Sequence, residues 1–419
     1  MAASMAADDF SGSLLVARDG QPIFNKSYGF ANIELGVPNT PQTVFRIASI
    51  TKPFTATAIM MLQERGKLKV GDSICKYLAD CPDAWQPITI KNLLTHTSGI
   101  PNYLNFPGYL SNIALPVTHE QMIGTFRNKP LEFVPGEKFA YSNSGYYLLG
   151  VIIERASGRP YAEFLQENIF APLGMKRTGD FDNRSIIKNR AAGYSLMNDR
   201  PANAIYFDRS QLLATGSLWS TTEDLLLFDQ ALYTEKLVSR KILDEMFTLS
   251  VADYGYGWQV APMFGRPLIA HGGDTLGFMG VLQRFTADRT TIILLSNKGY
   301  MNILTLARDI PAIVFGEKYE LPRKIKAFHV DAKTLQQYTG KFQLPNSVVL
   351  TVTVEDGKLM MQNSSNTRPK GELFAESETT FRRTGVDATF TFERDTSGRV
   401  AAIVIRNVNG AITNAPRIN

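Results

Sequence analysis

Two stretches of alternating apolar and polar residues lie at opposite ends of the chain, with a long region of helical periodicity between them. Residues 13–17 and 22–29 flank the turn 18–21, which predicts a β-hairpin. Apolar residues then recur at helical spacing over residues 50–62. We expect that helix to end near Gly66, because glycine is the common residue just past a helix.

The middle of the chain continues with helices and then turns to strands. Tyr146, Leu149 and Ile153 share one helical face, and residues 220–223 read as a capping box that opens another helix. Consecutive strands and a last helix follow, at about 254–260, 267–270, 280–285, 290–297 and 302–315. This order predicts an α+β fold in which helices flank an antiparallel sheet.

The pattern becomes almost wholly β after a linker at residues 321–324. Residues 348–354 alternate, turn at 355–358 and return at 359–361, and further short strands follow at 380–382, 388–392 and 400–405. Regularly spaced short strands indicate a small barrel or sandwich. We therefore expect a catalytic domain at 1–320 and an all-β domain at 330–419. The second carries no catalytic cluster and reads as a packing or interaction module.

Composition and charge narrow the function classes. The 419 residues are 44% hydrophobic and 20% charged, as in globular proteins rather than disordered ones. The net charge of +5 is spread without a run of Lys or Arg, which gives a nucleic-acid role little support. Apolar runs are too short for a membrane span, and the first ten residues lack the basic start and apolar segment of a signal peptide.

The cysteines, Cys75 and Cys81, are six positions apart. They could close a small disulfide loop in an oxidising compartment, or they could be two reduced thiols. We favour the disulfide, because there are two cysteines and they are neighbours in the sequence.

Ser49 and Lys52 place a hydroxyl and an amine three residues apart at the start of a predicted helix, so both would lie on one face. Such a serine can be activated as a nucleophile, and its N–H can help hold an oxyanion. The plainer interpretation is a serine N-cap followed by a solvated lysine. The same Ser-x-x-Lys pattern recurs at Ser73 and Ser185, so it selects nothing by itself.

Two further motifs could complete such a site. Tyr-x-Asn occurs at Tyr103, Tyr141 and Tyr300, of which Tyr141 lies at a loop-to-helix junction. His271-Gly272-Gly273-Asp274 adjoins a predicted strand, where glycines let a substrate backbone approach closely. The four histidines lack metal-ligand spacing, so neither a metal nor another cofactor is expected.

Taken in order, these motifs resemble the serine β-lactamase-related family, which includes class C β-lactamases, DD-peptidases, D-aminopeptidases and esterases. The resemblance runs over about residues 10–316 and is carried by Ser49-x-x-Lys52, residues 93–100 (Leu-Leu-Thr-His-Thr-Ser-Gly-Ile), residues 135–143 with Tyr141-Ser142-Asn143, and His271-Gly272-Gly273. It implies an all-helical subdomain beside the sheet. The segment after Phe328 resembles the lipocalin-like domain appended to some members.

The resemblance implies a role for each motif residue. Ser49 is the acylated nucleophile, and Lys52 must be at least partly neutral or stabilise charge. Tyr141 shuttles a proton between Ser49 and the leaving group, which requires that Lys52 lower its pKa. Asn143 binds the substrate amide or orients Lys52, and the N–H groups of Ser49 and Asp274 match the oxyanion hole.

The chain departs from the family at the third motif. Many members have Lys-Thr-Gly where His271-Gly272-Gly273 stands, and a histidine is largely neutral near pH 7. This moves the expectation from efficient β-lactam hydrolysis toward esters, amides or short D-amino-acid peptides, with weak β-lactam hydrolysis left open. The alternative is a penicillin-binding or peptide-binding protein that acylates slowly. The resemblance favours a periplasmic or secreted protein, while the compartment and the oligomeric state stay open.

Overall fold

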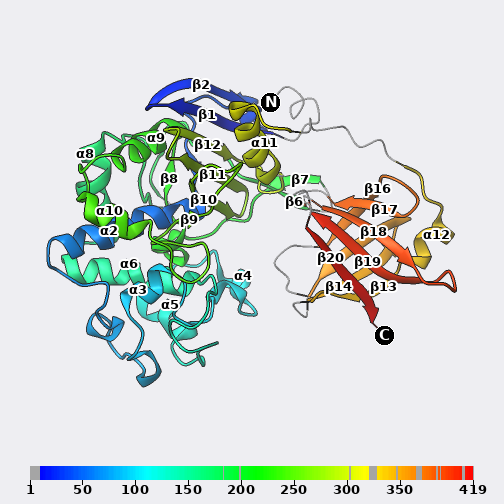
Figure 1. The fold of residues 1–419 in the computed structure, drawn as a ribbon, viewed down its shortest axis with the longest axis horizontal. Coiled ribbons are helices and arrows are strands. Elements are labelled where there is room, and N and C mark those ends of the chain that lie inside the picture. Colours follow the sequence, from blue (N-terminus) through cyan, green and yellow to red (C-terminus); the bar gives the residue numbers. More distant parts are fainter. Residues whose placement is uncertain are drawn as a thin grey trace. The chain divides into compact units, whose positions relative to one another are not determined.

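A six-stranded antiparallel sheet carries the hairpin predicted at the N-terminus (Figure 1). In the computed structural model its strand order is β2-β1-β12-β11-β10-β9. The strands are β1 (Gly12–Arg18), β2 (Gln21–Tyr28), β9 (Gln259–Val260), β10 (Leu268–Thr275), β11 (Phe278–Phe285) and β12 (Thr290–Ser296). β1 pairs with β12, so the two ends of this part of the chain meet in one sheet.

The structure describes residues 10–182, 184–197, 200–301, 303–319, 328–345, 348–364, 370–383, 386, 388–407 and 411–418. The chain falls into two compact units, one built from Ser11–Ser195 with Asn203–Gly299, the other mostly from Tyr300–Asn419. The expected domain limits, 1–320 and 330–419, stay a prediction. The predicted linker at 321–324 lies outside the described residues.

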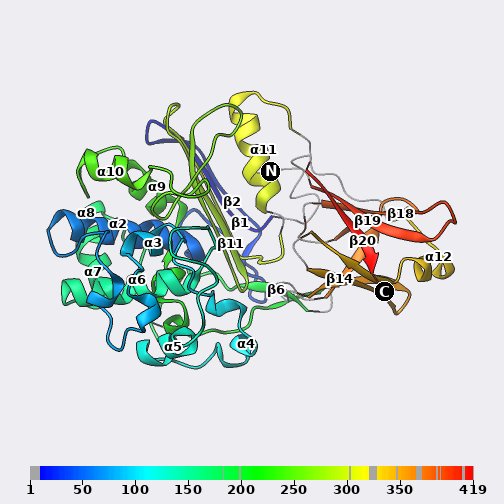
Figure 2. The same ribbon diagram turned by 60° about the horizontal axis from the view of Figure 1, so that its bottom comes forward.

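Helices, turns and short two-stranded sheets form the rest of the first unit. α2 (Thr51–Glu64) is buried over twelve consecutive residues, because it packs against α6 (Asn143–Ser157) and other helical segments. α9 (Thr222–Ala231) covers β1 and β12. Figure 2 shows α2, α3 and α6 together on one side of the sheet. The remaining helices here are α3 (Ile90–Leu94), α4 (Tyr109–Asn112), α5 (His119–Phe126), α7 (Tyr161–Leu165), α8 (Ala171–Leu173) and α10 (Arg240–Met246).

Most predicted elements are present, and two expectations are wrong. The N-cap of α9 is Thr221, whose side chain accepts from the Asp224 N–H, so the cap lies one residue after the Ser220 that the predicted box requires. In the predicted strand 254–260, β9 begins at Gln259, since Gly257 has a φ of +78° and turns the chain beforehand. The predicted end of α2 is confirmed: Gly66 has a φ of +67° and follows its last turn.

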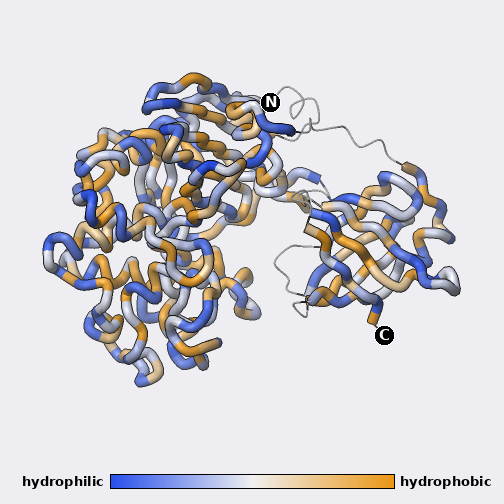
Figure 3. Tube along the Cα trace, viewed as in Figure 1, coloured by the Kyte–Doolittle hydropathy of each residue, from blue (hydrophilic) through white to orange (hydrophobic). Residues whose placement is uncertain are grey.

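The C-terminal β pattern forms a closed antiparallel barrel, which decides between the barrel and the sandwich. Its strands, in spatial and sequence order, are β13 (Gly340–Gln343), β14 (Val349–Glu355), β15 (Lys358–Asn363), β16 (Gly371–Ala375), β17 (Thr380–Arg383), β18 (Ala388–Arg394), β19 (Val400–Asn407) and β20 (Ile412–Ile418). Buried and exposed residues alternate along them, and Figure 3 follows the hydropathy along the chain. Tyr338, Phe342, Phe381 and Phe392 pack together inside, so aromatic rings fill the barrel. α11 (Ile303–Phe315) and α12 (Ala332–Gln337) precede it.

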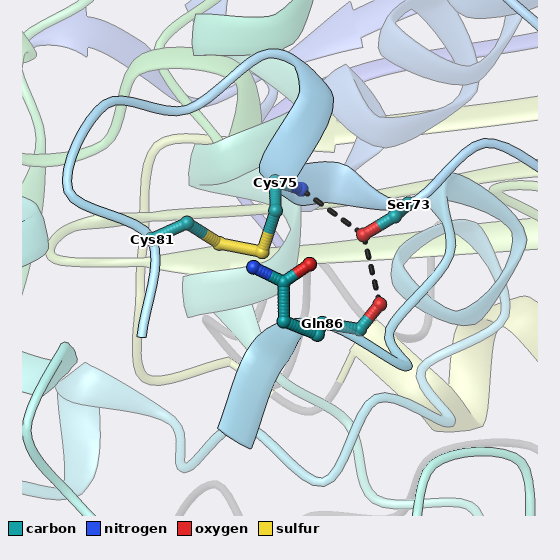
Figure 4. The surroundings of a disulfide bond; sticks show 4 residues. All are labelled: Ser73, Cys75, Cys81 and Gln86. Carbon is teal, nitrogen blue, oxygen red and sulfur yellow. Dashed lines mark hydrogen bonds between the residues drawn. A yellow bond between two sulfur atoms is a disulfide. The ribbon is translucent and has the colours of Figure 1, made fainter. Parts of the chain in front are cut away.

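Cys75 and Cys81 form a disulfide, with Cα atoms 5.3 Å apart, as the sequence favoured (Figure 4). The bond joins the 3₁₀ turn Ile74–Lys76, which contains Cys75, to Cys81 six residues later. Among the described residues, no helix is long and apolar enough to cross a membrane.

Candidate active site

Ser49 lies on a tight turn immediately before α2, at the helix start that the sequence predicts. The 3₁₀ turn Ala48–Ile50 leads directly into Thr51, the first residue of α2. Ala48 has a φ of +47°, which residues other than glycine seldom adopt. Such backbone strain is common at functional sites. The turn follows β5 (Phe45–Arg46), a short strand that pairs with β8 (Trp219–Ser220).

Lys52 is wholly buried beside this turn, and its amine meets three oxygens. Nζ lies 3.1 Å from the Ser49 hydroxyl, 2.8 Å from Asn143 Oδ1 and 2.8 Å from the Thr215 carbonyl oxygen. Burial lowers the pKa of Lys52 well below its ordinary value, because the charged form loses its hydration. Of the two roles expected of Lys52, a partly neutral amine or a charge stabiliser, the lowered pKa favours the first.

This geometry suits a general base. An amide oxygen and a carbonyl oxygen can accept hydrogen bonds and cannot donate them, so Nζ must donate to both Asn143 and Thr215. A neutral amine has two protons and one lone pair. When both protons are used in this way, the lone pair is left for the Ser49 hydroxyl, which can then donate its proton to Nζ.

Tyr141 lies over the same amine, and its pKa is shifted in the direction opposite to the one expected. Its ring centroid is 4.9 Å from Lys52 Nζ, and its hydroxyl hydrogen-bonds with Ser49. Burial raises the pKa of Tyr141, and the hydrogen bond to Ser49 offsets part of that rise. The expected lowering by Lys52 is wrong, because the same burial favours the neutral amine, which cannot stabilise a phenolate.

Asn143 connects the lysine to a residue that the sequence reasoning missed. Its N–H and its Nδ2 lie 3.2 and 3.3 Å from Asn102 Oδ1, which orients its own Oδ1 toward Lys52. The Thr215 carbonyl was also missed. A backbone oxygen has no sequence signature, whereas an asparagine in the loop just after the residues 93–100 motif is a signal that could have been followed.

β10 brings the third motif to the nucleophile. The predicted strand extends through residues 268–275, so His271, Gly272, Gly273 and Asp274 lie within it. β9 pairs with β10 at Ile269 and Ala270, and Gly273 farther along approaches the turn before Ser49. A Cβ at Gly273 would lie 2.3 Å from the Ile47 carbonyl oxygen, whereas one at Gly272 would meet nothing nearer than 3.9 Å.

His271 is buried and held through both ring nitrogens. Nδ1 lies 2.6 Å from the Gly272 carbonyl oxygen, which can only accept, so Nδ1 carries the proton. Nε2 therefore accepts from the Tyr254 hydroxyl at 2.9 Å, a partner that the sequence reasoning did not anticipate. Burial, with Lys52 nearby, lowers the pKa of His271 to about 3. The side chain supplies no fixed positive charge at neutral pH.

The competing motifs have other roles in the described part of the chain. Ser73 caps a 3₁₀ turn and donates to the Gln86 carbonyl oxygen (Figure 4). Ser185 donates to Asp182, and the buried Tyr103 hydroxyl donates to the Gln211 carbonyl oxygen. The remaining Tyr-x-Asn pattern begins at Tyr300 and ends on residue 302, which lies outside the described residues. The described side chains contain no group of three or more His, Cys, Asp or Glu that could hold a metal ion.

Comparisons with known proteins show the family to which the chain belongs. Residues 2–310 match the family described as Beta-lactamase, and residues 325–415 match a domain of unknown function (DUF3471). The chain is 33% identical over 424 residues to Penicillin-binding protein 4* of Bacillus subtilis, which covers 92% of this chain and 91% of that protein.

Two solved structures have the same fold. The octameric penicillin-binding protein homologue from Pyrococcus abyssi has a TM-score of 0.70 at 26% identity, with 99% of this chain and 97% of that one covered. A D-stereospecific amidohydrolase from Streptomyces sp. has a TM-score of 0.64 at 26% identity, with 76% and 99% covered. This chain, which also carries a C-terminal barrel, belongs to the β-lactamase family of serine hydrolases.

Proposed function

We propose that the protein hydrolyses an ester or amide of a small molecule or short peptide through a Ser49 acyl-enzyme. The observation that carries the proposal is the buried Lys52 amine, with two acceptor-only oxygens on one side and the Ser49 hydroxyl on the other. Ser49 Oγ attacks the carbonyl carbon while its proton moves to Nζ. The N–H groups of Ser49 and Asp274 are the proposed donors to the oxyanion.

Tyr141 is the proposed acid. Because burial raises its pKa, the phenol keeps its proton at neutral pH and can donate it to the leaving group as the carbonyl–leaving group bond breaks. The proton taken up by Lys52 then returns to Tyr141. The alcohol or amine has left by then. Water later attacks the acyl carbon and gives a proton to Lys52 Nζ; that proton passes to Ser49 Oγ as the acyl–Oγ bond breaks, and the carboxylic acid leaves with Ser49 restored.

The proposed substrates are esters, amides and D-amino-acid peptides rather than anionic β-lactams. A neutral His271, hydrogen-bonded to Tyr254, offers no fixed charge to a substrate carboxylate. The similar Streptomyces protein is described as a D-stereospecific amidohydrolase, which supports an amide carbonyl as one target. The Ser49–Lys52 arrangement is compatible with both the alcohol leaving group of an ester and the amine leaving group of an amide.

A panel of p-nitrophenyl esters, D-amino-acid amides and nitrocefin tests the proposal. Ser49→Ala should abolish turnover of every substrate that the wild type accepts, because no acyl-enzyme can form. Ser73→Ala is the matched control: it removes a hydroxyl from the same Ser-x-x-Lys pattern, and activity should be unchanged. Activity retained by Ser49→Ala would refute the assignment.

A second candidate function is supported by the similar Bacillus subtilis protein, which is named as a penicillin-binding protein. In that case acylation is followed by little turnover. Intact-mass spectrometry after incubation with a labelled penicillin distinguishes the two: a stable Ser49 adduct without released product favours binding, and product without a lasting adduct favours hydrolysis.

A further inference from the structure

His96 occupies a conformation that its loop must enforce. It follows α3, is 1% exposed, and has a φ of +55°. A non-glycine residue with positive φ is uncommon, although histidine and asparagine are enriched among the exceptions. Within this loop the side chains of Thr95 and Thr97 hydrogen-bond to each other. His96 instead makes its contacts with the segment that contains Tyr141.

The peptide groups on both sides of Tyr141 are hydrogen-bonded to His96. The Ala140 N–H donates to the His96 carbonyl oxygen at 2.9 Å, and the Ser142 N–H donates to His96 Nδ1 at 3.1 Å. The His96 ring lies against the Tyr141 ring, with centroids 4.2 Å apart. One residue therefore holds the chain before Tyr141, the chain after it and the aromatic ring itself.

We propose that His96 is the positioning residue of Tyr141, acting through its Nδ1 as the acceptor for the Ser142 N–H. The proposal rests on the proposed function, in which Tyr141 is the acid. Because Nδ1 accepts, the proton of the neutral ring is on Nε2. A doubly protonated ring would direct one N–H at another and release the segment after Tyr141.

The surroundings of His96 favour this neutral ring. Burial, with Lys52 and His271 nearby, lowers the pKa of His96 well below its ordinary value. The ring also packs against Tyr146 and Tyr254, with centroids 4.9 and 4.8 Å away. A role in packing and a role as acceptor therefore coincide in the wild type, and the test must separate them.

His96→Asn and His96→Gly form a matched pair for that purpose. Both tolerate a positive φ, and both remove the aromatic ring, but the asparagine keeps an acceptor oxygen at the position of Nδ1. We expect His96→Gly to lower kcat about 100-fold, the effect of misplacing a catalytic group by about 1 Å. We expect His96→Asn to recover at least about tenfold of that loss, with KM in both variants within about threefold of the wild type.

The outcomes are distinguishable from failure of the proposed function. If Ser49→Ala is inactive and the two His96 variants lose kcat equally, the ring acts through packing and the inference is overturned. If Ser49→Ala keeps its activity, the proposed function itself has failed. A measurement on the wild type does not depend on folded variants: ¹⁵N NMR of the histidines should show His96 with a bare Nδ1 and a protonated Nε2. A proton on Nδ1 would overturn the inference.

Discussion

Replacement of Gly273 by alanine should push β10 away from the turn that contains Ser49. A Cβ there would lie 2.3 Å from the Ile47 carbonyl oxygen and 3.3 Å from Ala48 Cβ, where ordinary contact begins at 3.4 Å. The obstructing atom belongs to the backbone, which cannot rotate away. β10 must therefore move from the Ser49 turn by about 1 Å, which widens the gap between the N–H groups of Ser49 and Asp274.

The expected loss of kcat follows from the misplaced oxyanion donors. A displacement of about 1 Å in a catalytic group costs about 100-fold in rate, and loss of one oxyanion donor costs about 100- to 1,000-fold in kcat. We expect Gly273→Ala to lower kcat for p-nitrophenyl acetate within that range. Gly71→Ala, where a new Cβ meets nothing within 4 Å, should leave kcat unchanged, and Gly272→Ala, with 3.9 Å of clearance, should lose less than Gly273→Ala.

Steady-state kinetics of the three variants, with thermal unfolding measured in parallel, completes the test. A folded Gly273→Ala enzyme whose kcat stays near that of the wild type would refute the reasoning, because the strand would then be free to move without consequence for the oxyanion. An equal loss in Gly272→Ala would also contradict it, since that methyl displaces no backbone atom.

Three further predictions concern other parts of the first unit. Because the pKa of Lys52 is lowered, kcat/KM should fall on the acidic side of the pH profile as Lys52 gains its proton, at a pH below the ordinary lysine range. Lys52→Arg should remove the activity, and with it this pH dependence. Replacing Cys75 and Cys81 together by alanine should lower the free energy of unfolding by about 2 kcal/mol in urea titrations, while thiol titration of the native wild type should detect no free thiol. Arg284→Met should cost about 3–5 kcal/mol in the same titrations, because it leaves the buried Asp229 carboxylate without its ion-pair partner.

Periodicity predicted the elements that have many regular residues. The hairpin of β1 and β2, the end of α2 at Gly66 and the strands β14, β15, β18 and β19 follow from local patterns. Strands β13, β16 and β20 were missed, since they are short or, in β20, contain a proline. The predicted strand 254–260 failed because the backbone at Gly257 turns away to approach the Lys52 carbonyl oxygen, a contact distant in sequence.

The motifs nominated the site residues, and their resemblance to the β-lactamase-related family chose Ser49 over Ser73 and Ser185. What local sequence cannot contain is the depth at which a side chain is buried. Burial lowers the pKa of Lys52 and of His271 and raises the pKa of Tyr141. The expected direction for Tyr141 was wrong for that reason.

The sequence by itself determined which residues could carry acyl-transfer chemistry and where helices and strands would lie, because both depend on residue types and spacing along the chain. The tertiary structure decided the protonation states and the partners, among them Asn102, Thr215 and Tyr254. These depend on distances between segments far apart in sequence, and on a dielectric environment that exists after those segments have packed.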